Sequence, residues 1–311
     1  MNQNRIRGLV AAPFTPFHAD GSVDLAKIAP YANHLSNDGV AGVFVCGTTG
    51  EGYSLSIDER MSVAAAWAAA LPKSMRLIVH VGHNSIKESR RLSAHAAASG
   101  AHAIAMMPPF FFKPSGVEEV VRCCKEVAAA APELPFYFYH IPSMSGVHLP
   151  MAELVPAAAA AIPNFAGIKF TFEDIEDFQK CRGWAGEDYD LFFGRDEILL
   201  SALRVGATAA VGSTYNFAAP LYLELIRAFN EGDNTRAEAL QAEAVRMIDT
   251  VVKGPWHPLA AFKWLMTKVG VDCGPTRLPV NPLTAEQITI LESRLAGFIE
   301  ERLKLTEPLK V

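Results

Sequence analysis

Eight short apolar runs follow one another along the chain, and a longer helix-compatible stretch separates each run from the next. Each run has the length of a β-strand. Several are apolar at nearly every position, which is typical of parallel strands covered on both faces. The series therefore predicts eight β/α units. The predicted strands occupy residues 7–12, 40–46, 77–81, 102–107, 135–139, 165–170, 191–193 and 207–211.

Two α/β architectures are built from such units, the closed barrel and the doubly wound sheet. No G-x-G-x-x-G turn follows the first predicted strand, so the main reason for choosing a dinucleotide-binding sheet is missing. The pattern favours a (β/α)8 TIM barrel. Ser56 with Glu59, and Ser85 with Glu88, have the spacing of a capping box and predict the starts of two of its helices.

The remainder of the chain, after an eighth helix expected at about 220–229, shows helical periodicity at 234–252, 256–269 and 284–303. No linker rich in Pro, Gly or Ser precedes it. We therefore predict a catalytic barrel at 1–231 and a C-terminal helical extension at 232–311 that packs on the barrel and contributes to subunit contacts.

Composition narrows the classes of partner and the compartment. The net charge is −5 with Lys and Arg dispersed, so the chain lacks the basic stripe of a nucleic-acid-binding protein. No apolar stretch reaches the ~18 residues that span a bilayer, and residues 1–10 lack the apolar core of a signal peptide. Five cysteines without C-x-x-C spacing indicate reduced thiols. We expect a cytoplasmic protein that binds neither membranes nor nucleic acid.

The reactive groups of such a barrel lie at the carboxyl ends of its strands. Lys169 interrupts an apolar run there, and burial disfavours its ammonium form, leaving an amine that can attack a ketone. A lysine that reaches solvent, or that a carboxylate neutralises, is an equal alternative from position alone. Tyr139 ends the preceding strand and can move a proton to or from a substrate hydroxyl, although Tyr137 and Tyr139 also suit a core.

Two further kinds of turn follow predicted strands. Thr48 and Thr49 lie in a glycine-rich turn at 47–52, where hydroxyl and N–H donors suit a carboxylate; a plain tight turn is the alternative. Asp196 and Glu197 follow the seventh strand and a 212–216 turn follows the eighth. The carboxylates can bind the hydroxyls of a polyol, or simply begin a helix.

Together these segments resemble the pyruvate-dependent class I aldolase superfamily, which contains dihydrodipicolinate synthase and N-acetylneuraminate lyase. The similarity covers about residues 6–279 and rests on the segments at 47–51, 139–142, 167–169 and 212–216. The resemblance implies that Lys169 forms a Schiff base, that Tyr139 shuttles protons, and that Thr48 and Thr49 hold the pyruvate carboxylate. It implies that the reaction needs neither a metal nor a cofactor. It also implies that the protein assembles as a homotetramer or a homodimer.

Within this superfamily the chain is more similar to the lyases than to the synthases. The synthase pattern has an arginine five residues after the tyrosine, where this chain has Met144. Resemblance to the lyases implies retro-aldol cleavage of N-acetylneuraminate to N-acetylmannosamine and pyruvate. It also implies that the sugar contacts a set of residues comprising Thr171, Gly194, Asp196, Glu197 and Ser213.

One segment departs from the superfamily pattern. Many members carry a tyrosine, in the loop after the fourth strand, that reaches into a neighbouring subunit's site, whereas this chain has phenylalanine at 110–112. Two alternatives stay open: an aldolase or dehydratase for another 2-keto-3-deoxy sugar acid, which should differ at Asp196 and Glu197, and a non-catalytic ligand-binding protein on the same barrel.

Overall fold

The computed structural model describes residues 5–303, and eight parallel strands close into a barrel within them. Strand β1 pairs with β2 on one side and with β8 on the other, so the sheet has no free edge. The predicted TIM barrel is confirmed. The strands are β1 (Gly8–Ala11), β2 (Gly42–Val45), β3 (Arg76–His80), β4 (Ala103–Met106), β5 (Phe136–His140), β6 (Phe165–Phe170), β7 (Asp190–Phe193) and β8 (Ala209–Gly212).

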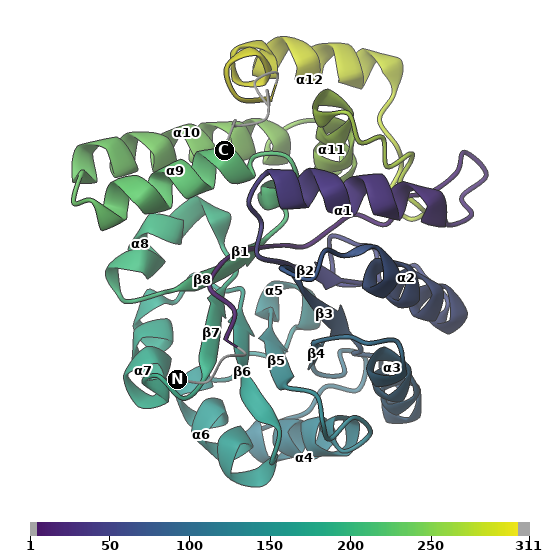
Figure 1. The fold of residues 1–311 in the computed structure, drawn as a ribbon, viewed down its shortest axis with the longest axis vertical. Coiled ribbons are helices and arrows are strands. Elements are labelled where there is room, and N and C mark those ends of the chain that lie inside the picture. The colour runs from purple at the N-terminus through teal and green to yellow at the C-terminus, as the bar shows by residue number, and fades with distance from the viewer. Residues whose placement is uncertain (1–4, 304–311) are drawn as a thin grey trace.

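Helices surround the strands, as Figure 1 shows. Those of the barrel are α1 (Ile28–Asn37), α2 (Ile57–Ala70), α3 (Ile86–Ala98), α4 (Val117–Ala128), α5 (Pro142–Ser145), α6 (Met151–Ala161), α7 (Ile175–Ala185), α8 (Leu199–Arg204) and α9 (Ala219–Asn230). Short turns of 3₁₀ helix at Leu25–Lys27, Asp196–Ile198 and Thr214–Asn216 lie in the connections.

The two predicted capping boxes have different outcomes. At α2 the Ser56 side chain accepts a hydrogen bond from the Glu59 N–H, and the Glu59 carboxylate accepts one from the Ser56 N–H. At α3 the Ser85 side chain caps the helix, but the N–H of Ser85 donates to Nδ1 of His83 at 2.9 Å. The prediction of a reciprocal box at Ser85 is therefore wrong, because a nearby imidazole supplies the acceptor that Glu88 was expected to supply.

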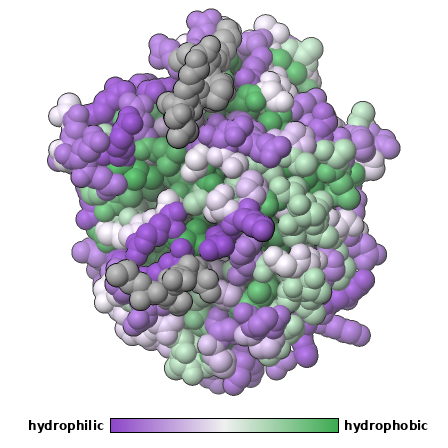
Figure 2. Space-filling view, viewed as in Figure 1, coloured by the Kyte–Doolittle hydropathy of each residue, from purple (hydrophilic) through white to green (hydrophobic). Residues whose placement is uncertain are grey.

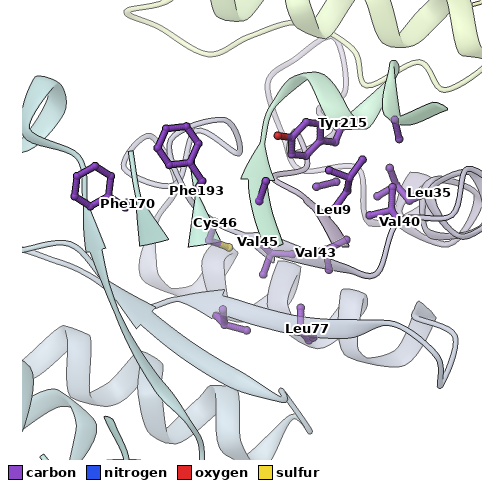
Figure 3. Packing of buried hydrophobic residues seen from close by; sticks show 14 of the residues in the cluster. Leu9, Leu35, Val40, Val43, Val45, Cys46, Leu77, Phe170, Phe193 and Tyr215 are labelled. Atoms are coloured by element: carbon purple, nitrogen blue, oxygen red, sulfur yellow. The ribbon is translucent and has the colours of Figure 1, made fainter. Parts of the chain in front are cut away.

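Two hydrophobic cores lie on opposite faces of the barrel wall. The larger fills the space between strands and helices and includes Val43, Val45 and Phe170, which Figure 3 shows pointing away from the strands. The smaller fills the barrel interior and includes Tyr139. Successive side chains of a strand point to opposite faces, so Lys169, the residue before Phe170, points into the barrel.

The C-terminal extension consists of α10 (Asn234–Val252), α11 (Pro258–Leu265) and α12 (Ala285–Phe298), with a 3₁₀ turn at Met266–Val269 and a π-helical turn at Ile299–Leu303. Helix α10 packs along α9, and α12 lies beyond α11 (Figure 1). The division of the chain at residue 231 stays a proposal, and residues 1–4 and 304–311 of it lie outside the described structure.

Hydrophilic residues are spread over the face seen in Figure 2 and are interspersed with hydrophobic ones. Within residues 5–303, no helix combines the length and the apolar character that crossing a membrane requires.

Candidate active site

A cavity of about 180 Å³ opens at the carboxyl ends of the strands. This is the end at which (β/α)8 enzymes carry their reactive groups. All nine residues selected from the sequence line this cavity, although they lie at the ends of five different strands or in the loops that follow them: Thr48, Thr49, Tyr139, Lys169, Thr171, Gly194, Asp196, Glu197 and Ser213. Their chemical roles remain predictions.

Lys169 and Tyr139 face each other across the β5–β6 pair, in which they are direct register partners. Lys169 as a whole residue is 4% exposed, and its Nζ lies 4.1 Å from the centre of the Tyr139 ring and 4.2 Å from that of Phe44. Among residues 5–303 no carboxylate forms a salt bridge with it. Neither alternative from the sequence applies, because this amine neither reaches solvent nor is neutralised by an acid.

The Tyr139 hydroxyl is positioned beside the glycine-rich turn that follows β2. Its oxygen lies 3.4 Å from Oγ1 of Thr48, and its ring meets those of Phe44 and His80 edge to face. The ring is therefore held by packing while the hydroxyl remains at the cavity wall. This arrangement allows a phenol to exchange a proton with a group bound next to Lys169.

The glycine-rich turn also contacts the turn after β8. Oγ1 of Thr49 lies 2.6 Å from Oγ of Ser213. A side chain at Gly52 would place its Cβ 1.9 Å from the Cys46 carbonyl oxygen, so the close return of this turn requires glycine. The turn thereby presents the two threonine hydroxyls to the cavity, as an anion site requires.

Asp196 is buried, and Thr214 binds one of its two carboxylate oxygens. Its Oδ2 accepts hydrogen bonds from Oγ1 of Thr214 at 2.6 Å and from the N–H of Thr214 at 3.3 Å. Its Oδ1 and the Oγ1 of Thr171 are buried without a hydrogen-bond partner in the described structure. Burial raises the pKa of Asp196 above its usual range. Unpartnered buried polar atoms are rare in native proteins, and because Asp196 and Thr171 line the cavity, these two atoms can bind a polar ligand there.

Glu197 occupies a different position from its neighbour. It lies at the rim, paired at 3.5 Å with Arg195, which also pairs with Glu173 at 2.7 Å. Burial, followed by the charge of Asp196, raises the pKa of Glu197. The interpretation of both acids as a helix start is also accurate, since the Asp196–Ile198 turn begins there.

Sequence reasoning missed several residues of the cavity wall. Ile248 and Val252 of α10 and Phe262 of α11 line it, so the C-terminal extension forms part of the site. Their helical periodicity marks which face is buried but contains no information about the surface it meets. Ala12 and Ile141 also line the cavity, and no chemical signal in their side chains could have selected them.

The two departures noted in the sequence lie outside the cavity lining. Met144 is 58% exposed. Phe110 packs against the Tyr53 ring with 4.8 Å between ring centres, whereas Phe111 and Phe112 are 74% and 86% exposed. The loop after β4 thus presents two apolar rings to solvent.

His80, a histidine near the site, is held by hydrogen bonds to the backbone. His80 is buried, with Nδ1 3.2 Å from the Cys46 carbonyl oxygen and Nε2 accepting from the Met107 N–H at 3.3 Å. In the described part of the chain, no three His, Cys, Asp or Glu residues are grouped to bind a metal ion.

His140 should make folding stability pH-dependent. Burial lowers its pKa from 6.5 to about 4, and the neighbouring His148 acts in the same direction. Between these values the unfolded chain binds a proton that the folded protein does not, so stability falls as pH falls. Between pH 7 and pH 5 the free energy of unfolding of the wild type should fall by about 2 kcal/mol because of His140. The His140→Asn variant should lack this contribution. Urea unfolding at both pH values measures it.

The control for this prediction is His95→Asn, which changes a half-buried histidine on α3. This variant should show the same difference in free energy of unfolding between pH 7 and pH 5 as the wild type, measured at the same protein concentration. An equal pH dependence in wild type and His140→Asn would contradict the prediction.

A family comparison covers nearly the entire described chain. The model of the dihydrodipicolinate synthetase family matches residues 5–297. The chain belongs to this family. Among curated members, N-acetylneuraminate lyase of Mus musculus is 42% identical over 297 residues, which cover 94% of this chain and 92% of the relative. N-acetylneuraminate lyase of Homo sapiens is 41% identical with the same coverage.

Solved structures of family members have the same barrel. N-acetylneuraminate lyase of Proteus mirabilis has a TM-score of 0.91 and 42% identity, over 94% of this chain and 98% of that one. A dihydrodipicolinate synthase of Bacillus anthracis has a TM-score of 0.88 at 28% identity, over 94% and 98% of the two chains. Because family members with different activities share this fold, the activity has to be argued from the site.

Proposed function

We propose that this protein is an N-acetylneuraminate lyase, a carbon–carbon lyase that reversibly cleaves N-acetylneuraminate to N-acetylmannosamine and pyruvate through a lysine Schiff base. The observation that carries the proposal is the buried, unpaired Lys169 amine beside Tyr139 at the carboxyl end of the barrel. The relatives described above, at 41–42% identity, are named for this activity.

In the proposed reaction Lys169 attacks the C2 ketone of the open-chain substrate and loses water to give a protonated imine. The imine accepts the electron pair of the C3–C4 bond when that bond breaks. Tyr139 takes the proton from the C4 hydroxyl, so that N-acetylmannosamine leaves as an aldehyde. The remaining enamine is protonated at C3, and hydrolysis releases pyruvate and the free lysine.

The other residues of the cavity would bind and orient the substrate. Thr48 and Thr49 supply hydroxyl donors for the carboxylate next to the ketone. The hydroxylated tail would extend toward the unpartnered Oδ1 of Asp196 and Oγ1 of Thr171. Gly194, Glu197 and Ser213 complete the wall on that side. A Cβ at Gly194 would lie 2.1 Å from Oγ1 of Thr171, so glycine leaves this hydroxyl room.

The synthase activity has weaker support in this chain. Resemblance to the synthases would require an arginine in place of Met144 to bind a second substrate's carboxylate. Methionine has no donor for that purpose, and here it is 58% exposed and outside the cavity lining.

The test is pyruvate release from N-acetylneuraminate, measured beside a panel of 2-keto-3-deoxy sugar acids. The proposal expects N-acetylneuraminate to be the preferred substrate. If pyruvate were released only from another member of the panel, the proposed substrate would be wrong, but the proposed aldolase chemistry would stand. Borohydride treatment with pyruvate, followed by mass spectrometry, separates an enzyme from a binding protein, because only the enzyme would gain a stable adduct on Lys169.

We also propose a homo-oligomer, a tetramer or a dimer, in the cytoplasm. Self-association would cover the exposed rings of Phe111 and Phe112, and contiguous exposed apolar surface is typical of interfaces. All five cysteines are free thiols, which suits a reducing compartment.

A further inference from the structure

Lys263 is a second buried lysine, and it extends from α11 of the C-terminal extension to the barrel. Its side chain is 1% exposed. The ammonium donates hydrogen bonds to the carbonyl oxygens of Thr15 at 2.8 Å and Pro275 at 2.7 Å, and to Oε1 of Glu51 at 3.1 Å. Three acceptors thus use all three donors of the ammonium, so this lysine has a fixed position.

Glu51 belongs to the turn that carries Thr48 and Thr49. Its side chain is 2% exposed, and its second oxygen, Oε2, accepts from the N–H of Arg277 at 2.8 Å. Its backbone has φ +53°, a left-handed conformation that is strained for a residue with a side chain. The two contacts of the carboxylate therefore hold the turn in a conformation that its backbone alone disfavours.

Thr15 connects Lys263 to the same turn by a second route. Its hydroxyl donates to the Gly50 carbonyl oxygen at 2.6 Å, and its own carbonyl oxygen accepts from Lys263. Lys263 therefore supports two successive residues of the turn, Gly50 through Thr15 and Glu51 directly. On the other side of Gly50, the Thr48 and Thr49 hydroxyls lie beside Tyr139 and Ser213 in the cavity.

The Lys263–Glu51 pair is buried, whereas Arg277 beside it is partly exposed and pairs with Glu59. The Lys263 ammonium and the Arg277 guanidinium lie 4.2 and 4.4 Å from the centre of the Phe17 ring. Burial lowers the pKa of Lys263, and the Glu51 carboxylate opposes that effect. Removal of one member of a buried pair leaves the other as an uncompensated charge that must seek water. The turn would have to move for Glu51 to do so.

We propose that Lys263 is a positioning residue that, through Glu51 and Thr15, holds the Thr48–Thr49 turn in the geometry that binds the substrate carboxylate. It does not line the cavity and touches no reacting atom. The inference rests on the proposed function, because it assumes that the two threonines bind the pyruvate carboxylate. It assigns to the C-terminal extension a role in affinity for the keto acid.

The test uses Lys263→Met, which removes the charge and keeps much of the side-chain length. Full-length protein is titrated with pyruvate, treated with borohydride, and analysed by mass spectrometry. We expect the half-saturating pyruvate concentration to rise about tenfold or more, because misplaced binding groups weaken productive binding steeply. The adduct on Lys169 at saturating pyruvate should be unchanged. In the lyase assay KM should rise much more than kcat falls.

Glu51→Gln provides the second variant, because glutamine keeps the size and a hydrogen-bond acceptor for Arg277 while it removes the charge. We expect the same shift in half-saturation. The Lys263→Met/Glu51→Gln protein should bind pyruvate no more weakly than the worse single variant, since the two residues act through one contact. If Lys263→Met is insoluble, the Glu51→Gln titration decides the question.

Lys268→Met is the matched control. Lys268 lies in the same extension, pairs with Glu292 at 2.6 Å and lies 4.5 Å from the centre of the Trp264 ring, so it also has one ion pair and one ring contact, although it is partly exposed and does not touch the turn. It should keep the wild-type half-saturation. Folded Lys263→Met or Glu51→Gln with wild-type half-saturation would overturn the proposal. Absence of an adduct in the wild type would instead refute the proposed function.

Discussion

Lys169→Met is expected to abolish pyruvate release and the borohydride-trapped adduct, with a loss in kcat on the order of 10⁴-fold or more. Without the amine no imine forms, so the electron pair of the breaking bond has no acceptor. The variant should fold, because methionine fills the space between the Phe44 and Tyr139 rings without a buried amine. A coupled pyruvate assay and intact-mass analysis measure the two losses.

Two lysines provide the comparison for this prediction. Lys180→Met alters an exposed lysine paired with Glu176 and should leave both readouts unchanged. Lys263 is buried as well, but its ammonium is fully engaged with three acceptors and should not be trapped. Peptide mapping that located the wild-type adduct on Lys263, or an adduct that persisted in Lys169→Met, would refute the assignment.

Tyr139→Phe is expected to lower kcat by about 10² to 10⁴-fold while the Lys169 adduct still forms at saturating pyruvate. The ring would keep its contacts with Phe44 and His80, so only the hydroxyl proposed to exchange a proton with the substrate's C4 hydroxyl is lost. The combination of slow turnover with intact trapping distinguishes proton transfer from binding. Steady-state assays and the borohydride titration provide the two measurements.

Tyr137→Phe is the control from the same strand. Its hydroxyl donates to Oδ2 of Asp190 at 2.8 Å and does not line the cavity. The control should lose some stability but keep kcat within a few-fold of wild type. Equal losses of kcat in the two variants would mean that the tyrosines of β5 act only through packing.

The barrel was predictable because its strands are buried on both faces. Parallel strands between an inner and an outer core must be apolar at nearly every position, and this requirement leaves a continuous signature in one dimension. The site followed from the same rule, since chemical side chains such as Lys169 and Tyr139 at strand ends meet at one rim. Their separation of one β/α unit sufficed to predict adjacent strands, and the register pairing places them opposite each other.

Local detail was less predictable where two partners competed for one group. The N–H of Ser85 had two candidate acceptors within three residues, and the imidazole of His83 forms the bond in place of Glu88. The spacing of residues in the sequence does not show which of the two side chains lies in position to accept this hydrogen bond. Likewise, the difference between Asp196 and Glu197 depends on Thr214, which a turn from another strand brings to Asp196.

The sequence by itself determined the eight-stranded barrel, the end of it at which the reactive groups were expected, and the nine residues that gather there. Only the tertiary structure decided that helices α10 and α11 close the cavity with Ile248 and Phe262. It alone paired Lys263 with Glu51, 212 residues away. The physical reason is that hydrophobic periodicity reports that a face is buried, whereas the partner of that face depends on how distant segments pack in three dimensions.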